Sequence, residues 1–74
     1  SFDLDGLDPS VLPAVGTPVP GGLSYYQAID LVSSVLKGRI CVGMDVVELA
    51  PFKNDLVSPF TAACLAQRLL ELVG

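Results

Sequence analysis

Four acidic residues stand out because the chain around them carries little charge. Of the 74 residues, 16% are charged and 51% are hydrophobic. Asp3 and Asp5 are separated by one residue, and Asp45 and Glu48 lie in a second apolar stretch. On an extended backbone, the Asp3 and Asp5 carboxylates would share one face and could hold one cation. Oxygen ligands favour Mg²⁺, Mn²⁺ or Ca²⁺. Glu48 could bind a cation of its own, metallic or organic.

The competing interpretation is that these acids are solvated loop residues. It is weakened by the apolar setting, because acids are costly where most neighbours are hydrophobic. Asp8 is different, because it precedes Pro9 and is therefore expected to be a turn residue.

Two apolar segments are predicted to position the acids. Ser1–Leu4 is expected to be the end of a strand, and residues 39–49 are apolar on both faces, which is typical of a central parallel strand. The order β–loop–α–β–α predicts an α/β fold. Because a right-handed crossover returns the second strand parallel to the first, all four acids are expected just past the carboxyl ends of the strands. Ligands bind at that edge in open α/β sheets.

Two helices are predicted. The first begins after Ser24, because Ser24 and Gln27 have the spacing of a capping box, and Gly38 is expected to end it in a left-handed conformation. The second begins at Ser58 and Pro59, taken as N-cap and first helical residue, and runs to the end of the chain.

The segment between the first strand and the first helix is expected to be a long ordered loop. Residues 5–23 contain four prolines and four glycines, which exclude regular structure. The loop also contains apolar residues expected to pack against the core: Leu7, Val11, Leu12 and Val19.

Charge and composition exclude several classes of function. The net charge is −4 and the four basic residues are scattered, so neither nucleic-acid binding nor a basic membrane-surface helix is expected. The uncharged stretch 9–29 contains four prolines and cannot be a transmembrane helix. Cys41 and Cys64 are expected to be buried free thiols of a cytoplasmic protein, and the absence of histidine argues against zinc.

Short metal motifs fit the first acids poorly. An EF-hand loop starting at Asp3 fails, because its sixth position is Asp8 rather than glycine. Phe2–Gly6 is similar to the start of the Asp-x-Asp-Gly-Thr motif of haloacid-dehalogenase phosphohydrolases, but Leu7 occupies the threonine position. That phosphohydrolase stays an alternative.

Three longer blocks decide between these possibilities. Ser1–Pro9, Gly16–Leu23 and Val42–Pro51 closely resemble the last signatures of the ureohydrolases, the arginase and agmatinase family. The resemblance implies a three-layer α/β/α fold with a parallel sheet. Residues 1–74 would be the C-terminal β-α-β-α portion of a single catalytic domain, without an internal boundary.

The resemblance also implies an activity. Ureohydrolases use two Mn²⁺ ions to hydrolyse a guanidino group to urea and an amine. Asp3 and Asp5 match metal ligands of the family, and Asp3 would bridge the two ions. Glu48 matches the glutamate that holds the guanidinium, and Thr17 matches a loop threonine near the substrate.

The third block favours one branch of the family. The run from Met44 to Pro51 looks closer to the agmatinases, which convert agmatine to putrescine and urea. Arginase, another guanidino-acid amidinohydrolase and a non-catalytic relative remain alternatives. A homo-oligomer, trimer or hexamer, is expected. The family's other ligands are absent from these residues, so we expect the 74 residues alone to be inactive and to aggregate or stay molten.

Overall fold

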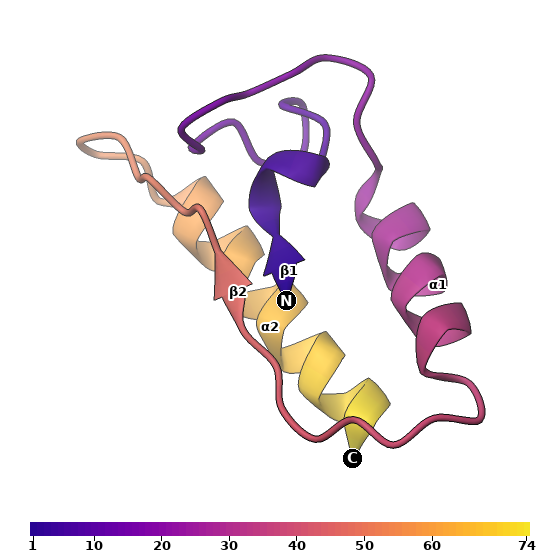
Figure 1. The fold of residues 1–74 in the computed structure, drawn as a ribbon. Coiled ribbons are helices and arrows are strands. Elements are labelled where there is room, and N and C mark those ends of the chain that lie inside the picture. The colour runs from indigo at the N-terminus through magenta and orange to yellow at the C-terminus, as the bar shows by residue number, and fades with distance from the viewer.

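Two short parallel strands lie beside two helices (Figure 1). The structure is a computed structural model that describes residues 1–74. In chain order, its elements are β1 (Phe2–Asp3), a single 3-10 turn η1 (Leu4–Gly6), α1 (Tyr25–Leu36), β2 (Val46–Val47) and α2 (Val57–Val73). The predicted order of elements is confirmed.

The strands pair as predicted but are much shorter than expected. They are parallel, with Phe2 opposite Val46 and Asp3 opposite Val47. The prediction of a strand over residues 39–49, covered on both faces, is wrong for this chain. Ile40 is 91% exposed and Val42 is 98% exposed. Residues 40–44 pair with no strand among the 74 residues, so no ladder of hydrogen bonds holds them.

Local sequence signals account for the start and end of α1. Gln27 N donates to Ser24 Oγ at 3.1 Å, and Ser24 N donates to Gln27 Oε1 at 2.9 Å, so both bonds of the predicted capping box are present. After the helix, Gly38 has a φ of 72°, which is the predicted left-handed conformation. Ala28 and Ile29 carry the buried face of the helix.

The start of α2 differs from the prediction. Ser58 is not the N-cap, because it lies inside the helix, which begins at Val57. Asp55 Oδ1 accepts hydrogen bonds from Val57 N at 3.1 Å and Ser58 N at 3.0 Å. The carboxylate therefore satisfies two N–H groups that the first turn leaves unpaired. Pro59 is still in the first turn, where its missing N–H costs nothing.

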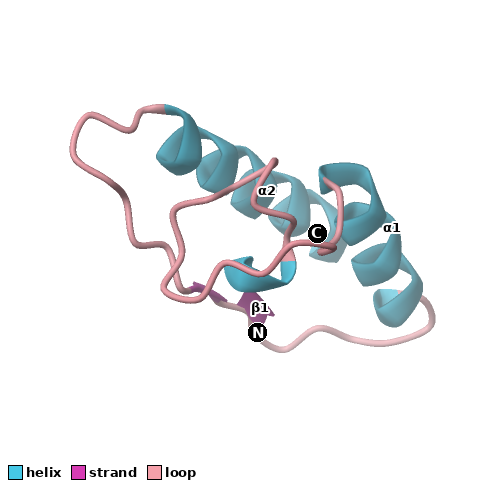
Figure 2. Cartoon of the chain, turned by 90° about the horizontal axis from the view of Figure 1, so that it is seen from above, coloured by secondary structure: helices cyan, strands magenta, loops and turns pink.

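The core is shared by the long loop and the two helices. Figure 2 shows both helices on the same side of the strands, where they contact each other. Three of the four loop residues expected to pack do so, but Val19 is 60% exposed and that prediction is wrong. The nine buried residues of the core cluster are Leu4, Leu7, Leu12, Val15, Ala28, Ile29, Ala62, Leu65 and Leu69.

The two remaining predictions concern thiols and membranes. Cys41 and Cys64 are free, as expected, but both are only partly buried. Neither helix is long and apolar enough to cross a membrane.

Candidate functional site

The carboxyl ends of β1 and β2 meet at one edge, where the candidate site lies. Asp3 is the last residue of β1, and it pairs with Val47, so Glu48 follows directly on the neighbouring strand. Asp5 and Thr17 reach the same edge from η1 and from the loop. The structure thus brings together all four residues that the resemblance singled out.

Asp45 does not belong to this group. It precedes β2, and its carbonyl oxygen accepts the Phe2 N–H at 2.9 Å, so it lies at the amino end of the strands. The expectation that all four acids lie past the strand ends is wrong for Asp45. The actual strand β2 begins after this residue rather than before it.

The geometry of the aspartate pair also departs from expectation. The backbone does not stay extended, because Leu4–Gly6 forms the 3-10 turn η1. Asp3 caps that turn, since its Oδ1 accepts a hydrogen bond from Asp5 N at 3.1 Å. This Asp3 oxygen is held by the protein, and Oδ2 makes no hydrogen bond within the chain. A sequence signal exists in hindsight, because Asp-Gly at positions 5 and 6 favours a turn.

Thr17 joins the loop to the aspartate pair. Its Oγ1 donates a hydrogen bond of 2.8 Å to Asp5 Oδ2, across 12 residues of sequence. Asp5, like Asp3, therefore has one oxygen held by a protein donor and one without a partner in the chain. Sequence spacing alone contains no signal for this contact.

Glu48 has an unusual backbone. Its φ of 77° is in the left-handed region, which non-glycine residues rarely adopt. The residues after it fix this conformation, because Leu49 forms an antiparallel bridge with Val15 and Ala50 N donates to Ala14 O at 2.8 Å. Such conformations cost energy and often occur at functional sites.

The Glu48 side chain runs toward the Thr17 loop. A Cβ atom placed on Gly16 would stand 3.7 Å from Glu48 Oε2, so the carboxylate lies against the residue that precedes Thr17. The loop therefore contacts Asp5 through Thr17 and lies beside Glu48 at Gly16.

Asp8 holds the ends of the long loop together. Its Oδ2 accepts hydrogen bonds from Ser10 N at 2.9 Å and from the Ser10 hydroxyl, which confirms the predicted turn. Its Oδ1 accepts from Gly21 N at 2.9 Å and Gly22 N at 3.3 Å, a role that we did not predict. The Ser10 hydroxyl, the Ser10 N–H and the glycine N–H groups lower the pKa of Asp8 to about 2, so it stays charged at neutral pH.

The backbone of Gly22 passes so close to that of Leu7 and Asp8 that only glycine fits at this position. A Cβ on Gly22 would stand 2.7 Å from Asp8 N and from Leu7 C, which leaves no room for a side chain. Leu23 continues the contact, because its N–H and C=O bond Gly6 and Asp8. Residues 21–23 thus close the loop over η1 and set the position of Thr17 between two fixed points.

The donor set fits a hard divalent cation but is incomplete within the chain. Asp3 and Asp5 offer oxygen atoms only, and each has one oxygen without a partner, which suits Mg²⁺ or Mn²⁺. No group of three histidine, cysteine, aspartate or glutamate residues is close enough to hold a metal ion. A complete site would need further ligands from other residues.

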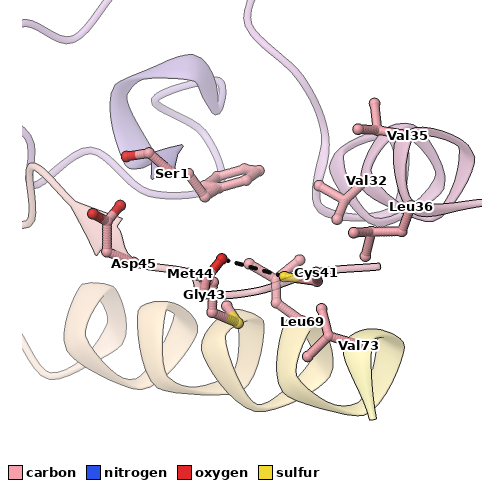
Figure 3. A pocket seen from close by; sticks show the side chains of 11 residues that line it. Ser1, Val32, Val35, Leu36, Cys41, Gly43, Met44, Asp45, Leu69 and Val73 are labelled. Atoms are coloured by element: carbon pink, nitrogen blue, oxygen red, sulfur yellow. Dashed lines mark hydrogen bonds between the residues drawn. The ribbon is translucent and has the colours of Figure 1, made fainter. Parts of the chain in front are cut away.

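The cavity in the structure lies elsewhere. Figure 3 shows it among Ser1, Asp45, the last turns of α1 and the end of α2, at the amino ends of the strands. Most of its lining is apolar, including Val32, Leu36 and Leu69. It is separate from the acidic edge and has no chemistry-bearing cluster.

Comparison with known proteins places this geometry in a family. Residues 1–73 match the model of the arginase family. An N(1)-aminopropylagmatine ureohydrolase from Thermus thermophilus is 49% identical over 74 residues, which are 100% of this chain and 25% of that protein. The chain therefore spans about a quarter of the length of the curated relatives it matches.

Solved structures agree with this result. A hypothetical agmatinase from Burkholderia thailandensis is 44% identical with a TM-score of 0.78, covering 97% of this chain and 23% of that one. The proclavaminate amidino hydrolase of Streptomyces clavuligerus is 32% identical with a TM-score of 0.81. The match covers 96% of this chain and 24% of that one. A match to one family over residues 1–73 sets the phosphohydrolase alternative aside. With its fold, its acidic edge and nearly all of its sequence in agreement, the chain belongs to the arginase family.

Proposed function

We propose that residues 1–74 form the C-terminal part of a longer ureohydrolase, which hydrolyses a guanidino compound to urea and an amine. One observation carries this proposal: the acids matching the family's functional positions meet at one edge, on a chain that matches the family over residues 1–73. The arrangement pairs oxygen ligands for metal with a separate carboxylate for an organic cation.

Asp3 and Asp5 would hold two Mn²⁺ ions, together with ligands from other residues. When bound, such ions supply a hydroxide nucleophile from water near neutral pH. The capping bond to Asp5 N and the Thr17 hydroxyl each hold one carboxylate oxygen, which orients the other. These contacts support a metal role because outer hydrogen bonds orient ligands.

Glu48 would bind the guanidinium of the substrate. A planar guanidinium presents paired N–H donors, and a carboxylate accepts them in a bidentate manner. The fixed backbone of residues 48–50 supports this role, because it keeps the carboxylate beside the Gly16–Thr17 loop.

We propose an agmatine-type substrate. The Thermus relative is named for an agmatine derivative, and the Burkholderia structure is described as an agmatinase. The Streptomyces enzyme, named for proclavaminate, is a reminder that the same fold supports other amidino substrates. Arginase activity is the second candidate.

The test uses the full-length protein loaded with Mn²⁺. Urea release is measured with agmatine, arginine, guanidinobutyrate and guanidinopropionate, for wild type and for Asp5→Ala. We expect urea from agmatine and a loss of at least about 100-fold in the variant, because a metal ligand is removed. Asp30→Ala, which removes an exposed acid of α1, is the matched control and should keep full activity.

The other possible outcomes of the urea assay would support different candidate functions. Urea from arginine alone would support the second candidate. A folded wild-type protein that binds Mn²⁺ but releases no urea would favour the non-catalytic relative. A trimeric or hexameric assembly and a cytoplasmic location stay predictions.

A further inference from the structure

We propose that Thr17 is a positioning residue, which orients the Asp5 carboxylate for a divalent cation and contributes little to substrate affinity. This inference rests on the proposed function, and it replaces the expectation that Thr17 contacts the substrate. The observation that carries it is the 2.8 Å hydrogen bond from Thr17 Oγ1 to Asp5 Oδ2.

A threonine hydroxyl has a single hydrogen to donate. In the structure that hydrogen is directed to Asp5 Oδ2, at the usual length of an O–H···O bond. The bond restrains rotation of the carboxylate and leaves Oδ1, which has no partner in the chain, in a fixed direction. Only the lone pairs of Thr17 Oγ1 remain for any other group.

The loop that carries Thr17 is fixed on both sides, so the hydroxyl is held in place. Before it, Val15 forms the bridge to Leu49, and Ala14 O accepts the Ala50 N–H at 2.8 Å. After it, Gly21 N and Gly22 N donate to Asp8 Oδ1. Although Thr17 is exposed, its backbone is therefore held by contacts to the residues that follow η1 and β2.

The experiment measures metal affinity and substrate kinetics separately in the full-length protein. Thr17→Val removes the hydroxyl and keeps the shape, whereas Thr17→Ser keeps the hydroxyl. Thr61→Val makes the same change on α2, where the hydroxyl bonds none of the four site residues. Mn²⁺ dissociation constants are obtained from the electron paramagnetic resonance signal of free Mn²⁺, and kcat and KM for agmatine are measured at saturating Mn²⁺.

We expect Thr17→Val to weaken binding of one Mn²⁺ about tenfold, the usual effect of losing a hydrogen bond to a metal ligand. Its KM at saturating Mn²⁺ should stay at the wild-type value. Thr17→Ser and Thr61→Val should both retain wild-type metal affinity. Rescue by serine assigns the effect to the hydroxyl rather than to the shape of the loop.

Three outcomes would overturn the proposal. The first is unchanged Mn²⁺ affinity in Thr17→Val together with a raised KM, which would assign Thr17 to the substrate. The second is an equal loss of affinity in Thr17→Ser, and the third is an equal loss in Thr61→Val. If Thr17→Val melts below wild type, Thr17→Ala takes its place with the same expectations. The Mn²⁺ titration stays readable even if no urea is released, so failure of the proposed function is recognised separately.

Discussion

At the scale of single residues, the site depends on carboxylates whose surroundings give each a different task. Asp3 and Asp5 each have one oxygen engaged by a protein donor, whereas Glu48 bonds no protein donor and points along the loop. Asp8 has both oxygens engaged and is therefore structural. All four residues are carboxylates, so the roles we propose for them differ because their hydrogen-bond partners differ.

A substitution at Glu48 tests the proposed binding of the substrate separately from the binding of Mn²⁺. Changing Glu48→Gln in the full-length protein removes the negative charge and retains the size. We expect kcat/KM for agmatine to fall about 10- to 100-fold, since a hydrogen bond to a charged group contributes roughly 1.5–3 kcal/mol. Steady-state kinetics measure this fall, while Mn²⁺ affinity should stay at the wild-type value.

The matched control is Glu71→Gln on α2. Glu71 pairs with Arg68 at 3.3 Å on the exposed surface, where an ion pair contributes little. Unchanged kcat/KM in Glu48→Gln, or an equal fall in Glu71→Gln, would contradict the role given to Glu48.

The sequence predicted that the candidate residues would meet at one edge, but it did not predict their contacts. Asp3, Asp5, Thr17 and Glu48 belong to blocks whose spacing indicated the family. The Thr17–Asp5 bond and the Asp8–Gly21 bond join positions 12 and 13 residues apart across an irregular loop. No periodicity applies to such a loop, so its closure cannot be derived from the pattern of residues.

At the scale of elements, the cap of α1 was predictable from local sequence, whereas the length of the second strand and the start of α2 were not. The capping box of α1 involves residues three apart, so the sequence contained all of it. The strand expected over 39–49 depends on neighbouring strands that these residues do not include, and only Val46–Val47 finds a partner. The start of α2 was misplaced because two acceptable caps, Asp55 and Ser58, stand close together and the carboxylate takes the N–H groups.

The cap of α2 predicts how stability depends on pH. The hydrogen bond from the Ser58 N–H, helped by the one from the Val57 N–H, lowers the pKa of Asp55 below its ordinary value of 3.8. The stabilisation is therefore complete above pH 3.8 and is lost as the pH falls through the lower folded-state pKa. Asp55→Ala should lower the Tm of the full-length protein by roughly 2–4 °C at pH 7, as expected for a lost cap.

Thermal melts from pH 7 down to pH 3 check this prediction. The difference in Tm between wild type and Asp55→Ala should shrink at the acidic end. Asp30→Ala, which removes an exposed acid that caps nothing, should show no difference at any pH. A constant difference for Asp55→Ala across the range would show that the cap does not depend on ionisation.

At the scale of the whole molecule, the 74 residues leave much of their apolar surface exposed. Only 11 of them are buried, while Ile40, Val42, Leu56 and Phe60 are each more than 70% exposed. Both helices lie on the same side of the strands (Figure 2), and Val47 of β2 is 37% exposed. The chain thus supplies two strands and two helices that cover one side of them.

We therefore expect the isolated 74 residues to aggregate or to remain molten. The measurements are differential scanning calorimetry and binding of a hydrophobic dye at neutral pH. A broad transition without a cooperative peak, together with dye binding, is the expected result, because exposed apolar surface marks loosely packed states. A sharp cooperative melt without dye binding would refute the expectation.

The pairing of β1 with β2 has a consequence for how the site can be lost. Its two registered pairs put Glu48 one step beyond the partner of Asp3. Removing one of the two residues of β2 would shift the phase of the chain after it and turn the following side chains to the opposite face. All the acids would still be present in the sequence, but they would no longer meet at one edge, so the number of residues in this short strand is itself part of what the proposed site requires.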